Sequence, residues 1–99
     1  MGGPAPAGDG RLFVALEGEA VVGCALAGLA ADRTAWITDV AVLDRVRRRG
    51  VGRRLVAATI GWAGKRGASV VRVEAAERAE GFWRAVGFGG SGRILERIP

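Results

Sequence analysis

The chain has 99 residues, a formal net charge of +5, one cysteine, and neither histidine nor tyrosine. This length allows one domain with a modest core, and 49% hydrophobic with 25% charged residues is typical of a globular protein. The composition excludes a disulfide within the chain, a histidine-dependent triad, a histidine metal site and a tyrosine general acid.

The ends and charges of the chain set further expectations. No basic segment followed by an apolar one opens the sequence, and no apolar run approaches the roughly 18 residues that cross a membrane. Cys24 lies in an apolar run, where a small core side chain is the expected role. We therefore expect a cytoplasmic protein with no membrane partner. Arginine carries nearly all the positive charge, which suits a polyanionic ligand such as coenzyme A or a nucleic acid.

The first half of the chain predicts three strands. Residues 1–10 are mostly Gly, Pro and Ala, so we expect a disordered segment followed by a single domain over residues 11–99. Strands over 12–17 and 20–29 should form an antiparallel hairpin around Gly18, and a third strand over 35–42 should lie antiparallel beside the second. Glycines within the second strand predict a bulge or a bend.

The stretch from Arg45 to Leu55 joins the third strand to a predicted helix over 51–66. The first N–H groups of a helix lack intrahelical partners, and the helix dipole adds about half a positive charge there. Gly50 and Gly52 let the backbone approach a ligand, and the neighbouring arginines present planar donor forks that suit phosphate oxygens. We therefore predict a cradle that binds a pyrophosphate.

The spacing of this stretch separates several phosphate motifs. The Walker pattern Gly-x-x-x-x-Gly-Lys-Ser/Thr fails because Gly64-Lys65 is followed by Arg66. The dinucleotide pattern Gly-x-Gly-x-x-Gly fails because its last position is Leu55. The stretch instead fits Arg/Gln-x-x-Gly-x-Gly/Ala, beginning at Arg47. A solvated arginine-rich loop before an ordinary helix is the alternative.

The second half of the chain predicts a crossover, a helix and a closing strand. The helix over 51–66 carries an apolar stripe and ends at Gly67; the stripe comprises Val51, Leu55, Ala58 and Trp62, with Val56, Ile60 and Ala63 beside them. A buried strand over 69–74 should run parallel to the third strand. A helix over 77–86 should end at Gly87, and residues 93–98 should pair with the region of Phe88.

Two signatures resemble those of the GNAT superfamily of N-acetyltransferases. Residues 47–52 resemble its acetyl-CoA-binding signature, and residues 76–88 resemble Asn-x-x-Ala-x-x-x-Tyr-x-x-x-Gly-Phe, with Ala79, Gly87 and Phe88 in register. The element order from Leu12 onward is similar to that fold from its second strand. The resemblance implies an α/β (α+β) class with a GNAT-like mixed sheet, in which antiparallel strands precede a β-α-β crossover and a C-terminal helix and strand.

The resemblance also implies a reaction and a site. Acetyl-CoA would be the co-substrate, and its acetyl group would pass by direct attack to a primary amine of a small molecule or a protein. The pantetheine arm would lie in a gap beside the third strand and the pyrophosphate on the cradle, while Arg47 would brace the turn. The implied contacts are the backbone groups of Val40, Ala41 and Val42 for the pantetheine, and of Arg48, Arg49, Gly50, Val51, Gly52 and Arg53 for the pyrophosphate.

Catalytic residues are left open by the sequence. Asp39, within the third strand, is a candidate base, and a solvated or paired strand carboxylate is the alternative reading; Glu74 and Glu77 are further candidates. Trp83 stands where many family members have the tyrosine that protonates the leaving thiolate, and an indole N–H cannot act as that acid. Ala76 replaces the usual asparagine. No metal is implied.

The family's first strand and first two helices have no counterpart in the sequence, although those helices form much of the acceptor wall. This leaves three alternatives: a compact enzyme completed by a second subunit, a truncated fragment of a longer acetyltransferase, or a non-catalytic acyl-CoA-binding or interaction module. An exposed apolar sheet face should then favour a homodimer. Nucleic-acid binding through residues 45–54 is disfavoured because the aromatic residues lie mostly on apparent core faces.

Overall fold

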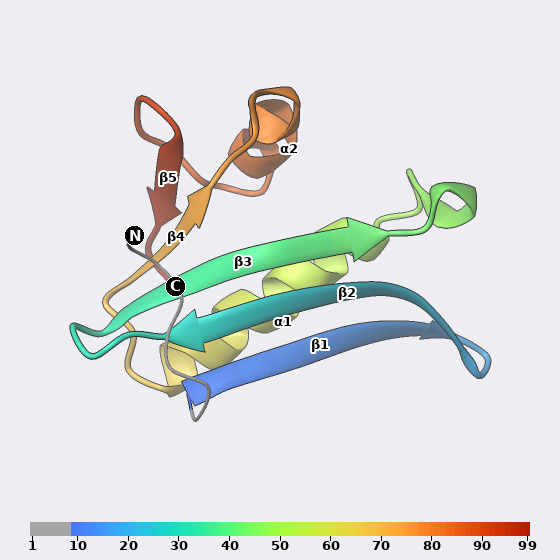
Figure 1. Cartoon of the computed structure of the whole chain (residues 1–99), viewed down its shortest axis with the longest axis horizontal. Coiled ribbons are helices and arrows are strands. Elements are labelled where there is room, and N and C mark those ends of the chain that lie inside the picture. Colours follow the sequence, from blue (N-terminus) through green and yellow to red (C-terminus); the bar gives the residue numbers. More distant parts are fainter. Residues whose placement is uncertain (1–8) are drawn as a thin grey trace.

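The computed structural model of the chain describes residues 9–99, which form one five-stranded sheet with two α-helices and two short 3-10 turns (Figure 1). The sheet order is β1-β2-β3-β4-β5. The elements are β1 (Gly10–Glu17), β2 (Ala20–Leu29), β3 (Thr34–Val42), η2 (Asp44–Val46), α1 (Val51–Lys65), β4 (Val70–Glu74), η3 (Glu77–Ala79), α2 (Glu80–Ala85) and β5 (Ile94–Arg97).

The strand pairing confirms the predicted mixed sheet. β1 and β2 form an antiparallel hairpin, β3 pairs antiparallel with β2, and β4 pairs antiparallel with β5. β3 and β4 are parallel, and α1 connects them, which is the predicted crossover. A bridge between Gly89 and Glu96 confirms the expected pairing of the two arms at the end of the chain.

Both helices pack on the same face of the sheet, which we call the covered face. Alternate residues of the strands point there because side chains alternate along a strand. Ile37, Val71, Val73 and Leu95 meet α1 and α2 in one core cluster. The buried residues of α1 confirm its predicted stripe except at one position, since Ala58 is exposed and Thr59 is buried instead. The Thr59 hydroxyl donates to the Leu55 carbonyl oxygen at 2.9 Å, so its burial leaves no unpaired polar group.

A glycine in β2 allows α1 to approach the sheet closely. A Cβ atom at Gly23 would lie 3.1 Å from both the Ala41 carbonyl oxygen and Leu55 Cδ1. The predicted irregularity lies beside this residue, because the β1–β2 register shifts between Ala15 and Leu16, which pair with Gly23 and Val21. The bulge thus accompanies the position where the helix presses on the strand.

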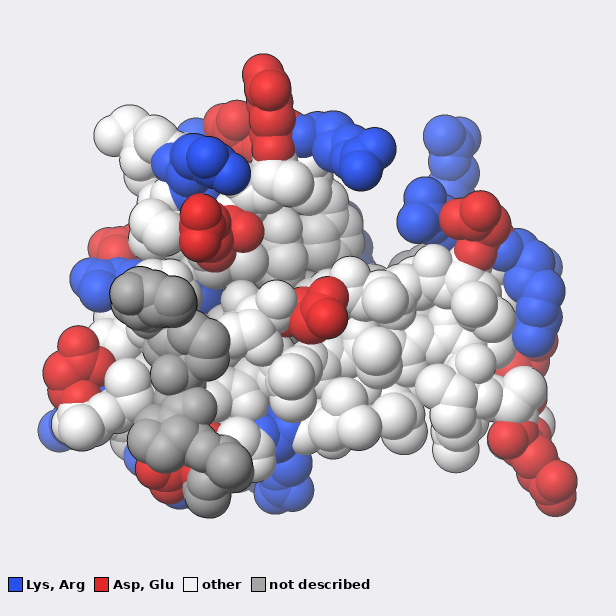
Figure 2. Space-filling view, viewed as in Figure 1, with Lys and Arg blue, Asp and Glu red and all other residues white. Residues whose placement is uncertain are grey.

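The opposite face of the sheet carries no helix from residues 9–99, and we call it the open face (Figure 1). Five of its side chains, from β1 and β2, are between 44% and 61% exposed: Leu12, Val14, Leu16, Val21 and Leu26. Figure 2 shows this side of the molecule as a largely uncharged surface with one acidic group near its middle. The expected exposed apolar face is therefore present.

Some predicted boundaries differ from those observed. Gly10 already belongs to β1, and Asp9 forms an ion pair with Arg66 at 3.4 Å, whereas residues 1–8 of the predicted disordered segment lie outside the described residues. The predicted helix over 77–86 is divided into η3 and α2. Ala76 has no side-chain oxygen that could cap the first N–H groups of this segment. The segment begins instead with a 3-10 hydrogen bond, which Ala79 N donates to the Ala76 carbonyl oxygen.

Candidate functional site

The sheet splits where β3 and β4 part. The two strands pair only from Thr34 with Val70 to Ile37 with Val73. β3 continues for five more residues, to Val42, along β2 alone, and the two strands diverge in Figure 1. Along this length the backbone groups of β3 that point away from β2 have no strand partner among residues 9–99. The predicted gap is therefore present, and Val40, Ala41 and Val42 line its β3 side.

A bulge marks the point of divergence. Leu26 pairs with Asp39 and the next residue, Ala27, pairs with Ile37, so Thr38 is the extra residue of β3. The Thr38 hydroxyl donates to the Leu26 carbonyl oxygen at 3.2 Å, which ties the bulge to β2. Bulges bend a strand and increase its local twist. Thr38 follows the last residue that pairs with β4, so the bulge accounts for the parting of the strands.

The turn between β3 and α1 has a strained, left-handed backbone. Arg48 has φ +67° and Gly50, the N-cap of α1, has φ +81°. Glycine adopts this conformation freely, whereas a residue with a Cβ atom does so at a cost of about 1–2 kcal/mol. Strain of this kind is typical of ligand clamps.

The same turn presents a row of free donors. The six consecutive backbone N–H groups from Arg48 to Arg53 donate no hydrogen bond to another residue of the described range. The first bond of the helix runs from Arg54 N to the Gly50 carbonyl oxygen at 3.0 Å. Free N–H groups at the positive end of a 15-residue helix form an anion site without help from side chains. All six residues predicted to hold a pyrophosphate belong to this row.

Arg47, which is predicted to brace the turn, contacts residues on both sides of it. Its Nε lies 3.2 Å from Asp44 Oδ1 and donates a long bond of 3.5 Å to the Val42 carbonyl oxygen. The side chain thereby links the end of β3 to η2. At the start of α1, Gly52 lies beside Phe82 of α2, since a Cβ atom there would be at ordinary contact distance, 3.4 Å from Phe82 Cε1. α2 therefore closes against the beginning of the cradle.

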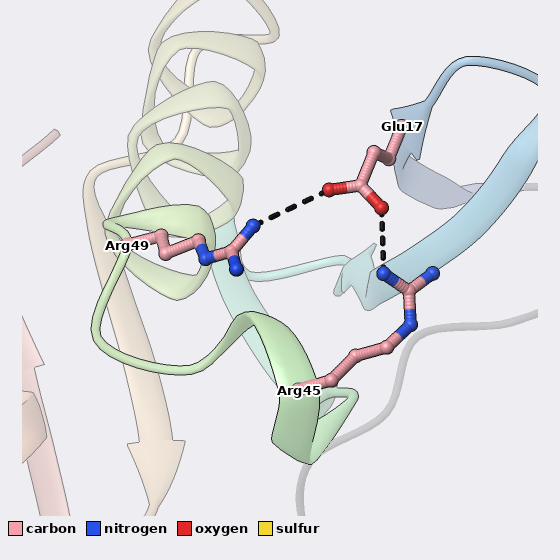
Figure 3. Close-up of polar contacts among 3 residues, drawn as sticks. All are labelled: Glu17, Arg45 and Arg49. Carbon is pink, nitrogen blue, oxygen red and sulfur yellow. Dashed lines mark hydrogen bonds and ion pairs between the residues drawn. The ribbon is translucent and has the colours of Figure 1, made fainter.

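Glu17 connects the β1–β2 hairpin to the cradle (Figure 3). One carboxylate oxygen accepts a hydrogen bond from Arg45 Nη1 at 2.6 Å, and the other lies 3.4 Å from Arg49 Nη1. The hydrogen bond from Arg45, together with its charge, lowers the pKa of Glu17 below its ordinary value. One carboxylate thus pairs with the side chains of two arginines of the turn.

The remaining arginines of this region are free to meet an anion. Arg48, Arg53 and Arg54 form no ion pair with other residues of the 9–99 range. Basic side chains gather around the turn at the right of Figure 2. The cradle therefore combines backbone donors with unpaired positive charge.

The candidate bases lie around the gap. Asp39 follows the bulge in β3 and pairs across the sheet with Leu26, so its exposed side chain stands on the open face. Glu74 ends β4, opposite the half-exposed Ile94, on the same face. Asp39 and Glu74 therefore flank one mouth of the gap, while Glu77 lies beyond it in η3. None of the three carboxylates has an ion-pair partner among the described residues.

Trp83 and Cys24 have structural surroundings. Trp83 is buried and packs edge-to-face on Phe82 and Phe88, with ring centroids 5.1 and 5.2 Å away. This agrees with a packing role and leaves the indole unsuited to proton transfer. The thiol of Cys24 is free, and the residue is partly exposed rather than fully buried as a core thiol would be. Among residues 9–99 no group of three or more acidic or cysteine side chains suits a metal ion.

Sequence reasoning did not identify Glu17, Thr38 and Phe82 as parts of the site. Glu17 is 28 residues from Arg45, and Phe82 contacts Gly52 across 30 positions, so neither pair lies within a local motif. Thr38 gave no signal beyond its β-branched side chain. A hollow of about 410 Å³ between β1 and α1, lined by Phe13, Val22 and Leu55 among others, lies outside the gap.

The chain is similar to known proteins in both sequence and fold. A family model described as the acetyltransferase (GNAT) family matches residues 5–88. A Bacillus cereus ATCC 14579 acetyltransferase structure has a TM-score of 0.85 at 17% identity, with 92% of this chain and 74% of that one covered. No curated protein sequence matches the chain. No helix of residues 9–99 has the length and apolar character needed to cross a membrane.

Two further similar structures are complexes with a bound ligand. PaiA N-acetyltransferase from Thermoplasma acidophilum, in complex with coenzyme A, has a TM-score of 0.82 at 16% identity, with 92% of this chain and 62% of that one covered. An aminoglycoside acetyltransferase from an uncultured soil sample, in complex with sisomicin, has a TM-score of 0.77 at 25% identity, with 85% and 60% covered. This chain therefore spans roughly three fifths to three quarters of these structures' length.

Proposed function

Since this chain belongs to the GNAT family of acetyltransferases, we propose that it transfers the acetyl group of acetyl-CoA to a primary amine by direct attack of the amine on the thioester. One observation carries the proposal. The free N–H groups from Arg48 to Arg53 lie at the end of β3, whose unpaired edge begins at Thr38. A pyrophosphate and an extended amide-containing arm are the two consecutive parts of coenzyme A that such a surface would bind.

The binding mode follows from these two parts. The pyrophosphate would accept hydrogen bonds from the N–H groups of the cradle, with Arg48, Arg53 or Arg54 screening its charge. The pantetheine arm would add to the free edge of β3 along Val40, Ala41 and Val42, as an extended peptide adds to a sheet edge. A neighbouring structure that contains coenzyme A supports this choice of ligand. Acetyl-CoA would be a co-substrate rather than a resident cofactor.

The chemistry is a single displacement at the thioester carbonyl carbon. The amine nitrogen forms a bond to that carbon and loses a proton, and the carbon–sulfur bond breaks to release the thiolate of coenzyme A. Binding both reactants in the gap supplies proximity, and a free N–H group of β3 would stabilise the developing oxyanion. Asp39 or Glu74 would take the amine proton, directly or through water.

The leaving thiolate needs no acid from Trp83. A thiol has a pKa of about 8.5, so the thiolate is a competent leaving group near neutral pH. Trp83 packs edge-to-face against Phe82 and Phe88, and Phe82 in turn lies beside Gly52 at the start of α1. The acceptor is an amine of a small molecule or a protein; a relative crystallised with the aminoglycoside sisomicin makes polyamines and aminoglycosides the first compounds to test.

A second candidate function is an acyl-CoA-binding module without turnover. The burial of Trp83 and the lack of an ion-pair partner for Asp39 within the described residues favour it. Such a module would keep the cradle and the edge of β3. Binding experiments alone would not separate the two functions, whereas an assay of transfer would.

The experiment is a calorimetric titration of the chain with acetyl-CoA, followed in the same sample by measurement of free thiol released with a panel of amines. Binding with release above the no-protein rate supports the enzyme. Binding without release for any amine supports the module. A folded sample that fails to bind acetyl-CoA contradicts both, and salt-sensitive binding of DNA that coenzyme A does not displace would point to a nucleic-acid ligand.

A further inference from the structure

The open face has the composition of a buried surface. Its side chains from β1 and β2 are Leu12, Val14, Leu16, Val21, Cys24 and Leu26, none of which is charged. The opposite side of β1 carries Phe13 and Ala15, which pack against the core. A strand that alternates between two apolar faces belongs to a sheet that is covered on both sides. Something must therefore cover the open face.

We infer that a second copy of this chain covers it, through a two-fold symmetric contact between the two open faces. The five half-exposed aliphatic side chains lie on neighbouring, paired positions of β1 and β2, and contiguous exposed apolar patches of this kind mark interaction sites. The partly exposed neighbours Cys24 and Trp36 extend it toward the roughly 800 Å² per partner of a standard interface. The patch would form the apolar centre of the contact, and the polar residues around it would supply the rest of the buried area.

The charges of the face permit contact with an identical face. The apolar part, on β1 and β2, requires no complementary charge from what it contacts. The charged side chains lie beside it: Asp39 of β3 is opposite Leu26, and Arg72 of β4 pairs with Glu96 of β5 at 2.9 Å. Face-to-face pairing around the apolar part would leave this ion pair at the rim, the usual arrangement of an apolar centre and a polar border. In an isologous contact the same patch is used by both subunits, so the apolar part of one copy would meet the apolar part of the other.

Pairing through the free edge of β1 is the other way to join two copies. It would satisfy the unpaired backbone of β1, but it would leave Val14 and Leu26 in water, so it does not account for the composition of the face. The two arrangements predict different responses to a charge on the open face. This difference makes the inference testable.

The dimer would also complete the acceptor side of the gap, a step that rests on the proposed function. Asp39 and Glu74 stand at the mouth of the gap on the open face, beside the apolar patch. A second copy seated on the patch would therefore wall that mouth. Loss of dimerisation should then reduce acetyl transfer while leaving acetyl-CoA binding within about twofold.

The test measures mass by light scattering on a size-exclusion column at about 10–100 µM chain. The wild type should have twice the monomer mass of 10.3 kDa. Val14→Glu and Leu26→Glu, each at an exposed position, should weaken association at least 100-fold and give the monomer mass. Ala57→Glu, an equally charged change at an exposed position of α1, should remain dimeric.

Cys24 gives a readout that needs no variant. It is the only cysteine and lies within the apolar patch, so maleimide labelling should be at least tenfold slower at 100 µM than after dilution to a concentration at which the chain is monomeric. A monomeric wild type, or a dimer that survives both Val14→Glu and Leu26→Glu, overturns the inference. Because neither measurement involves acetyl-CoA, failure of the proposed function would leave this result intact.

Discussion

The cradle can be tested by placing one negative charge in it. In Gly52→Glu the new carboxylate would lie within the row of free N–H groups, where the pyrophosphate should bind. The fold should tolerate the change, because the new Cβ atom would lie at ordinary contact distance, 3.4 Å from Phe82 Cε1. A glutamate in the first turn of a helix also interacts favourably with the helix dipole.

The expected loss of affinity follows from Coulomb's law. Two unit charges about 5 Å apart at an effective dielectric constant of about 20 repel by about 3 kcal/mol. Screening by salt reduces this, so we expect acetyl-CoA to bind about 2–3 kcal/mol more weakly, or about 30- to 150-fold. The loss should shrink as the salt concentration rises.

Gly61→Glu is the matched control, since it makes the same change within α1 at an exposed position with no atom within 4 Å of the new Cβ. Calorimetry should find its affinity within about twofold of wild type, and thermal unfolding should show both variants folded. If Gly52→Glu binds acetyl-CoA within threefold of Gly61→Glu, the pyrophosphate does not lie on these N–H groups and the reasoning is wrong.

Three further outcomes are expected. Arg45 lowers the pKa of Glu17, so the ion pairs of Glu17 stabilise the fold at pH values above the usual pKa of a glutamate, and this stabilisation is lost as the pH falls through the lowered pKa. Between pH 7 and about pH 3, the Tm of Glu17→Gln should therefore drop less than the Tm of the wild type. An equal drop would contradict this. Trp83→Ala should lower the free energy of unfolding by about 3–5 kcal/mol in urea titrations and Trp83→Phe by less, whereas equal losses would deny a role to the aromatic stack. Gly23→Ala should lower the free energy of unfolding by about 1–3 kcal/mol, because the new Cβ atom would lie 3.1 Å from Leu55 Cδ1. Gly61→Ala should raise the free energy of unfolding by up to about 1 kcal/mol. The reverse order of stability would refute the close approach of α1 to the sheet.

Features that depend on neighbouring residues could be predicted from the sequence. The apolar periodicity of α1 and its stop at Gly67 follow from local geometry, and the observed helix ends one residue before the predicted end. The cradle is likewise local, because Gly50 and the start of α1 are consecutive. The division of the predicted helix over 77–86 into η3 and α2 was missed, although Ala76 lacks the capping side chain that an uninterrupted start would need.

Features that depend on distant residues were decided by the tertiary structure. The parting of β3 from β4 requires the bulge at Thr38, whose extra residue is defined only by the register against β2. Glu17 meets Arg45 across 28 positions, a pairing of surface charges that no periodicity encodes. The placement of Asp39 and Glu74 at the same mouth of the gap likewise exists only once the strands are aligned.

The open face depends both on the local sequence of β1 and on the packing of distant helices. An apolar side of β1 can be seen in the sequence alone, because Leu12, Val14 and Leu16 are two residues apart and therefore share one face of the strand. Which side receives the helices depends on packing between distant segments, since both faces of an isolated strand are equivalent until α1 and α2 pack against one of them. The other side is left apolar and uncovered for that physical reason.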